Sequence, residues 1–258
     1  MGKSFCVFII ITISVLNSGA DEKETNNLYL SLLVENYTKS RKHDFQVISW
    51  DDSSIIPWGE QEVLVSFNNQ RKTNIDIRDD TSGSVLDIFT LDYEITPFYM
   101  HGIFQTKFGN YETLIISHYL VGATGWTANL IIMHLITKTD SGYHHQELSS
   151  FFSSIDSFVD LNEDGITEFI CIKLILDVDG NFIVPSIFNF STTGEFRQST
   201  EFKTRPVRLD RSEGLIPISW EEVSKSVKDA SEVSEPRAYY HESNKTSSPH
   251  KTLKESCR

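Results

Sequence analysis

Short apolar runs broken by turn-forming residues recur along most of this chain, and they constrain its fold more than any other feature. The runs are rich in Ile, Phe, Val and Tyr, and the breaks read DDSS, DDTSG, VGATG and DVDG, which is turn chemistry. We therefore predict a mainly β fold, an antiparallel sandwich, barrel or partial propeller of about seven to nine strands. The predicted strands lie within residues 45–50, 62–67, 85–91, 112–120, 128–137, 155–161, 166–176 and 181–190.

The first 20 residues have the three parts of a signal peptide. Lys3 supplies a positive charge, residues 5–16 form a short apolar run, and Ser18 and Ala20 are small residues placed for a cut before Asp21. An uncleaved anchor is the alternative. No other stretch approaches the length of a membrane span. We therefore expect a secreted or periplasmic protein with no membrane span after signal cleavage.

Charge and cysteine content exclude two classes of protein. The chain has 36 acidic and 23 basic side chains, and a surface with that balance repels phosphate backbones, so we expect no nucleic-acid partner. Only Cys171 and Cys257 follow the predicted signal peptide, too few for a disulfide framework. Cys171 lies in an apolar run and is predicted to be a buried thiol, although a bridge between the two cysteines remains open.

The composition changes near residue 210, which divides the mature chain into a β-rich domain at 21–210 and a polar segment at 211–258. Ser219 and Glu222 form a capping box, so we predict one short amphipathic helix across 220–231. The residues after it are rich in Ser, Lys, Glu and Pro, and they contain too few apolar groups to offset the entropy of ordering. Residues 232–258 are therefore predicted to be disordered.

One loop carries the sharpest chemical pattern in the chain. Oxygen-bearing side chains alternate with other residues and a glycine permits a tight turn, which suits calcium because this ion takes six to eight oxygen ligands in a flexible cage. An EF-hand would need a glutamate where Cys171 stands, and the flanks are strand-like. The predicted calcium ligands are Asp160, Asn162, Asp164, Ile166 through its carbonyl oxygen, and Glu168.

The pattern D-x-N-x-D-G-x-x-E, running into a strand, resembles the calcium loops of integrin-alpha-like FG-GAP and VCBS-type repeats. In those families the loop joins two strands of a propeller blade. The resemblance covers one copy and about 13 to 20 residues. It implies the same ligand set, carried over position by position. The alternative is an acidic, glycine-containing turn that binds no ion, because Asp, Asn and Gly are also ordinary turn residues.

Histidines offer a second possible metal site. His118 and His134 fall in neighbouring predicted strands, and a hairpin closing near Thr124 would leave them roughly 13 Å apart, too far to share an ion. We interpret both as ordinary sheet residues. His144 and His145 are interpreted as a solvated pair in a polar loop.

No catalytic signature is present, so no catalytic residue is predicted. The chain lacks the G-x-S-x-G, C-x-x-C, H-E-x-x-H and G-x-x-x-x-G-K motifs. The acidic pairs Asp51-Asp52 and Asp79-Asp80 lie in turn-like contexts. Asp179-Gly180 is a strong signal for a hairpin between two long strands.

The leading hypothesis is a non-enzymatic exported β protein, stabilised by one calcium ion, that binds another macromolecule or a surface. One alternative is a secreted hydrolase in which calcium is structural, and a cleft lined by two carboxylates or a Ser–His–Asp cluster would favour it. The other is a periplasmic accessory or inhibitor protein that acts through the predicted helix. An exposed stripe of Trp220, Val223 and Val227 would favour that alternative.

Overall fold

The computed structural model describes residues 30–48, 55–67, 72–91, 93–95, 99–120, 129–151, 155–177, 180–210, 214–227 and 239–241. These residues form three antiparallel sheets, a helical turn at 30–33 and a short α-helix near the C-terminus, which confirms the predicted fold class. None of the helices they contain is long and apolar enough to cross a membrane. The predicted signal peptide lies outside the described residues.

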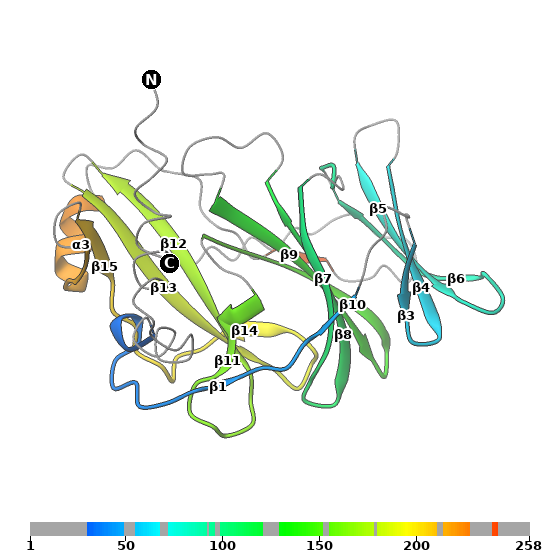
Figure 1. The fold of residues 1–258 in the computed structure, drawn as a ribbon, viewed down its shortest axis with the longest axis horizontal. Coiled ribbons are helices and arrows are strands. Elements are labelled where there is room, and N and C mark those ends of the chain that lie inside the picture. The colour runs from blue at the N-terminus through cyan, green and yellow to red at the C-terminus, as the bar shows by residue number, and fades with distance from the viewer. Residues whose placement is uncertain are drawn as a thin grey trace, which may run out of the picture.

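The four-stranded sheet is built from residues 55–91 and lies at the right of Figure 1. Its third strand alternates buried and half-buried side chains, as a strand does when one face packs on a core. That strand contains only two apolar side chains, Ile75 and Ile77, so a search for apolar runs does not predict it. The strand order is β3 (Ile55–Trp58), β4 (Gln61–Phe67), β5 (Thr73–Asp79) and β6 (Val85–Leu91).

The six-stranded sheet is the middle layer, and both of its faces are largely buried. Residues 131–137, for example, are all buried. Strands covered on both faces are expected to read as continuous apolar runs rather than alternating ones. The strand order is β2 (Gln46–Val47), β7 (Met100–Phe108), β8 (Tyr111–Tyr119), β9 (Leu130–Thr139), β10 (Gly142–Phe151) and β17 (Tyr239–His241).

Two predictions fail in this sheet. The tail at 232–258 was predicted to be disordered, but Tyr239–His241 pair with β10 as an edge strand. Two adjacent tyrosines, which favour strands, explain the difference. His144 and His145 were interpreted as a solvated loop pair, but both lie within β10, and only 3% of His145 is exposed.

The seven-stranded sheet contains the predicted calcium loop. Its two longest strands, β12 and β13, pair from Asp177 and Gly180 outward, which confirms the predicted hairpin; its turn at 178–179 lies outside the described residues. β14 (Phe196–Gln198) pairs with β13 off the main path. The strand order is β1 (Arg41–Lys42), β11 (Phe158–Asp160), β12 (Glu168–Asp177), β13 (Gly180–Phe190), β15 (Val207–Asp210) and β16 (Gly214–Pro217).

Two apolar cores join the three sheets. One lies between the four-stranded and six-stranded sheets and contains the buried indole of Trp58. The other lies between the six-stranded and seven-stranded sheets and is rich in phenylalanine, with Phe108 in contact with Phe158, Phe190 and Phe196. The six-stranded sheet therefore sits between the other two, as Figure 1 shows. The helical turn at 30–33 packs Leu33 into a third core on the seven-stranded sheet.

The short helix α3 (Trp220–Val227) begins with the predicted capping box. The Ser219 N–H donates to the Glu222 carboxylate at 2.8 Å, and the Glu222 N–H donates to the Ser219 hydroxyl at 3.2 Å. Val223 packs with Phe182 and Val184 of β13 and is only 5% exposed. The middle of the predicted apolar stripe is therefore buried, whereas Trp220 at its start is 46% exposed.

Candidate functional site

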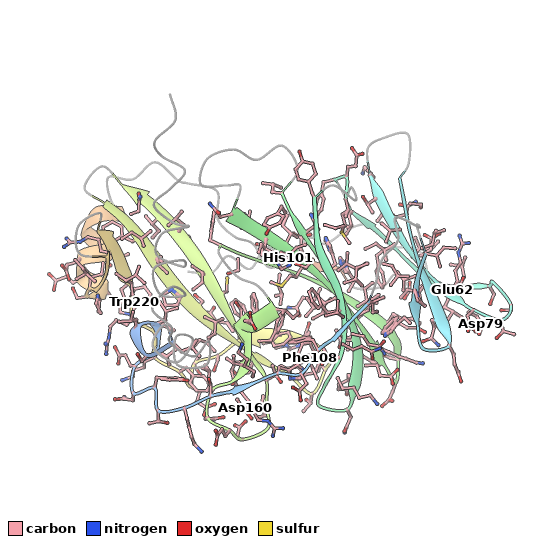
Figure 2. The ribbon with its side chains drawn as sticks, in the orientation of Figure 1. Glu62, Asp79, His101, Phe108, Asp160 and Trp220 are labelled. Atoms are coloured by element: carbon pink, nitrogen blue, oxygen red, sulfur yellow. The ribbon has the colours of Figure 1, made fainter. Side chains whose placement is uncertain are left out.

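The predicted calcium loop connects β11 to β12. Val159 pairs with Glu168 across these strands, and Phe158 and Phe169 beside them are buried in the phenylalanine-rich core. The register brings the first and last predicted ligands, Asp160 and Glu168, to the same end of the strand pair. Figure 2 shows Asp160 at this end of the sheet.

Hydrogen bonds within the loop hold it in a tight curl. The Asp160 carboxylate accepts the backbone N–H groups of Asp164 at 3.1 Å and Gly165 at 2.9 Å. The Asp164 carboxylate accepts the N–H of Ile166 at 2.7 Å. Glu163 and Gly165 have φ angles of 60° and 88°, and this left-handed backbone reverses the chain. The loop is therefore wound around its own carboxylates.

Glu168 is the most unusual residue of the loop, because its charged group is buried. It is 1% exposed, and its carboxylate accepts the N–H of Leu161 at 2.7 Å. Burial raises the pKa of Glu168 to about 7, although the Leu161 N–H opposes the rise. Nearby carboxylates raise this pKa further. The ionised form of Glu168 thus lacks compensating positive charge.

Those carboxylates belong to Asp164, Asp160 and Glu201. Glu201, which the sequence did not identify as a candidate, lies in the segment after β14. The Asn162 amide donates to Glu201 at 3.3 Å and to Asp164 at 3.0 Å, which ties that segment to the loop. No motif surrounds Glu201, and only the fold brings it beside the loop.

Cationic side chains do not neutralise this group. Within the described ranges, no lysine or arginine forms an ion pair with any of the four carboxylates of Asp160, Asp164, Glu168 and Glu201. Lys39 instead contacts Glu163, whose side chain is partly exposed. The carboxylates do not form a closed ion shell as they stand, because no three His, Cys, Asp or Glu side chains in the described part of the chain are placed to hold a metal ion.

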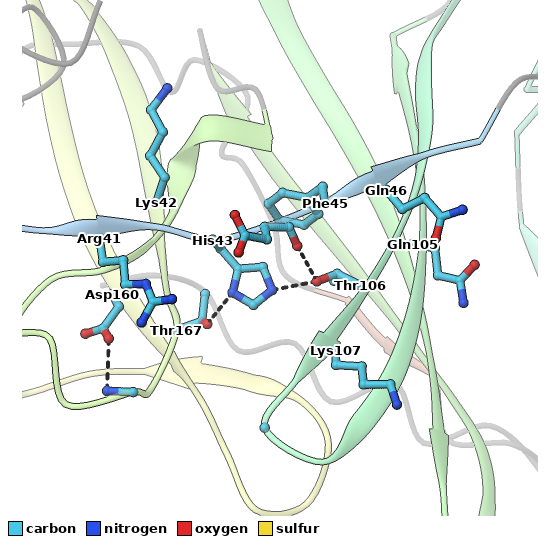
Figure 3. Close-up of a pocket in the computed structure, with 13 residues that line it drawn as sticks. Arg41, Lys42, His43, Phe45, Gln46, Gln105, Thr106, Lys107, Asp160 and Thr167 are labelled. Carbon is cyan, nitrogen blue, oxygen red and sulfur yellow. Dashed lines mark hydrogen bonds between the residues drawn. The ribbon is translucent and has the colours of Figure 1, made fainter.

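A pocket of about 670 Å³ lies directly beside the loop (Figure 3). Asp160, Gly165 and Thr167 form one wall. The segment from Arg41 to Gln46 and the end of β7 with Gly109 form the remainder. Asp160 and Gly165 belong both to the loop and to the pocket lining, so a change in the loop's shape would change the pocket.

His43 links the parts of the pocket. The Thr106 hydroxyl donates to the Asp44 carbonyl at 2.8 Å, so it accepts from His43 Nε2 at 2.6 Å. His43 Nδ1 then accepts from the Thr167 hydroxyl at 2.9 Å. This order leaves the imidazole neutral. Burial lowers the pKa of His43, with Asp44 opposing the change, and a neutral ring fits that direction.

Three basic side chains, Arg41, Lys42 and Lys107, line the pocket together with the acidic Asp44 and Asp160. Lys42 pairs with Asp156 at 3.3 Å and Lys107 pairs with Glu112 at 3.4 Å, and all four side chains are largely exposed. Arg41, by contrast, forms no ion pair with an acidic side chain among the residues that the structure describes. Its guanidinium is therefore available to an acidic group that enters the pocket.

The prediction that His118 and His134 lie too far apart was wrong. A hairpin closing near Thr124 would pair His118 with about Leu130, but His118 pairs with Ile132. His134 is therefore its diagonal neighbour on the same face of the sheet. The two Nε2 atoms are 3.1 Å apart. The hairpin turn that sets this register lies in residues 121–128, outside the described part of the chain.

Comparison with known proteins adds no relative to this description. No protein-family model, curated protein sequence or solved structure matches the chain.

Proposed function

We propose that this chain is an exported, non-enzymatic binding protein that holds one calcium ion in the loop at residues 160–168. The neighbouring pocket would then be where an acidic group of another macromolecule or of a surface binds. The ion would hold one wall of the pocket in shape. Secretion or export to a periplasm is part of the proposal and rests on the N-terminal signal-peptide pattern.

The buried carboxylate of Glu168 is the observation that supports this function most directly. A buried charge is costly unless it is paired or coordinates a metal. Glu168 is surrounded by three further carboxylates and has no cationic partner within the described residues. A divalent cation would remove this repulsion, and its binding would draw the group back to the ionised state.

The oxygen donors present fit calcium better than a softer ion. The loop offers carboxylates, an amide and a backbone carbonyl without histidine or thiolate, a set typical of Ca²⁺ and Mg²⁺. Asp160, Asn162, Asp164, Ile166 and Glu168 are the proposed ligands, and Glu201 can add another oxygen. These six donors reach the lower limit of the six to eight oxygen ligands that calcium takes. Magnesium keeps several of its water ligands, so a site in which the protein supplies all the donors suits it less well.

Calorimetric titration of the mature chain with Ca²⁺ tests the proposal. We expect measurable binding to the wild type and at least a tenfold loss of affinity in Glu168→Gln, because this change removes the buried charge. Glu163→Gln is the matched control, since it changes the same charge on a partly exposed loop residue outside the ligand set. We expect that control to bind calcium within about twofold of the wild type.

Thermal unfolding gives a second readout. Saturating calcium should raise the melting temperature of the wild type, and chelator should reverse the rise, because only the folded loop offers the site. A wild type that releases no heat with calcium and melts at one temperature with and without chelator would reject the calcium site.

A further inference from the structure

Three histidines lie in a row across three neighbouring strands, far from the calcium loop in sequence. They are His118 on β8, His134 on β9 and His145 on β10. The first two are fully buried and the third is 3% exposed. Their side chains share the sheet face that packs on the four-stranded sheet, beside an apolar core cluster and the buried carboxylate of Glu147. Buried polar groups in such a core need mutual hydrogen bonds.

Hydrogen-bond distances fix the order of protons along the row. His118 Nδ1 must donate to the Tyr119 carbonyl at 2.9 Å, so its Nε2 accepts from His134 Nε2 at 3.1 Å. His134 Nδ1 then accepts from His145 Nε2 at 3.0 Å. In this order each of the three imidazoles is neutral. The Tyr93 hydroxyl lies 2.9 Å from His134 Nε2 and donates to Glu147 at 2.5 Å.

Side chains from the four-stranded sheet and its exit segment cover the row. Phe89 of β6 lies against His145 with ring centroids 5.2 Å apart. Tyr93, which follows β6, lies 5.8 Å from both His118 and His134 by the same measure. The row therefore forms part of the joint between the two sheets. A change that destabilises the buried histidine row therefore also destabilises the packing of the four-stranded sheet on the six-stranded sheet.

The closed row disfavours added protons, because burial lowers the pKa of His118 and of His134. His134 has an imidazole neighbour at each ring nitrogen, and after burial these two neighbours are the causes that lower its pKa. Charge on two neighbouring rings would place two imidazolium groups in stacked contact, with centroids 5.3 Å or 5.2 Å apart, in a low-dielectric core. Opening the joint to water relieves that repulsion.

We propose that the row of His118, His134 and His145 makes the joint between the six-stranded and four-stranded sheets acid-sensitive, closed when the row is neutral and open when it is charged. Opening would expose the apolar faces of both sheets, including Trp58. Burial lowers the pKa of His118 to about 4 and that of His134 well below its ordinary value, so the closed joint binds fewer protons than the open one. Acid therefore favours the open state.

Other titratable groups near the row act less strongly or in the opposite sense. Burial raises the pKa of Glu147, which favours the closed joint in acid, but this is one group against the two imidazoles of His118 and His134. Tyr93 and Tyr143 stay protonated in acid. The apolar side chains of β4 and β5 complete the joint. β17 places His241 and Tyr239 opposite His145 and Glu147 in the strand register.

Hydrogen exchange on the full chain tests the proposal, with rates corrected for the intrinsic effect of pH. Between about pH 7.5 and pH 5, we expect protection in β3–β6 to fall at least tenfold more than protection in β12 and β13. In the double variant His118→Gln and His145→Gln, the amides preserve the acceptor and donor roles but cannot be protonated. It should lose most of that pH response. His144→Gln is the matched control. His144 lies on the same strand as His145, but its side chain is on the opposite face of the sheet, so this variant should keep the response.

Several results of this experiment would overturn the proposed acid-sensitive joint. Uniform loss of protection across all three sheets would overturn the proposal, as would a double variant with the acid response of the wild type. If the double variant does not fold near neutral pH, His145→Gln alone and the imidazole ¹⁵N shifts of the wild type replace it. Row histidines that gain protons while β3–β6 stay protected would equally overturn the proposal.

Discussion

At the scale of single residues, this protein buries ionisable groups in two places and handles them differently. Two hydrogen bonds join ring nitrogens of neighbouring histidines in the row, whose neutral form needs no net charge. Glu168 has only one backbone N–H donor and three acidic neighbours. The first arrangement needs no added charge, whereas a cation would relieve the second. This contrast is why we place the ion at the loop and the proton response at the row.

The raised pKa of Glu168 predicts a pH dependence for the calcium-free protein. A carboxyl whose folded pKa exceeds its unfolded value stabilises the fold below the unfolded pKa, and that stability is lost as pH rises through the folded pKa. In chelator, the contribution of Glu168 to stability should therefore fall by on the order of 1–2 kcal/mol between about pH 4.5 and pH 7, after allowance for solvent screening. Comparing urea unfolding of the wild type with Glu168→Gln isolates this group, because the variant should lack the dependence. An identical pH profile in both proteins would contradict the assignment.

At the scale of elements, local chemistry predicted some features well. The capping box at Ser219 and Glu222 forms the hydrogen bonds expected of it, and the hairpin before Gly180 closes as its sequence indicates. The predicted calcium loop, residues 160–168, curls where its glycine and acidic residues predict. Each of these depends on residues a few positions apart, so the sequence contains the necessary information.

The capping box gives a prediction for the helix. Ser219→Ala should lower the free energy of unfolding by about 1 kcal/mol, because the Glu222 N–H loses its side-chain acceptor at the start of α3. Urea denaturation measures the loss. Ser224→Ala is the control, since Ser224 donates to the Trp220 carbonyl inside the helix and alanine is the better helix former. Equal destabilisation by both changes would argue against a specific cap.

Features set by long-range pairing were not predictable in the same way. β5 and β10 carry many polar side chains and become strands because neighbours pair with them on both sides. A shift of two residues in one hairpin changed His118 and His134 from distant residues into hydrogen-bond partners. Glu201 lies beside the loop because of how the chain folds after β14, and no local sequence motif indicates this. These contacts follow from register and topology, which apolar patterning does not specify.

At the scale of the whole molecule, the phenylalanine-rich core joins the pocket to the rest of the protein. Phe108 is fully buried and contacts His43, whose hydrogen bonds reach β7 and the end of the calcium loop. Phe108→Ala should cost about 3–5 kcal/mol of unfolding free energy by leaving a cavity between two sheets, whereas Phe108→Leu should cost about 1 kcal/mol. Denaturant unfolding checks both values. Similar losses for the two variants would mean that cavity size does not set the cost.

The chain path has a consequence for how this architecture can change. β2 and β7 are hydrogen-bonded neighbours, and the Ile48 N–H donates to the Ile103 carbonyl at 2.9 Å, yet the entire four-stranded sheet lies between them in sequence. The polypeptide thus leaves and re-enters the central layer at nearly one point. The segment between β2 and β7, which contains the four-stranded sheet, could be lengthened, shortened or exchanged without changing the chain path through the other two sheets and the predicted calcium loop. The four-stranded sheet is therefore the part of the protein most open to replacement as a unit.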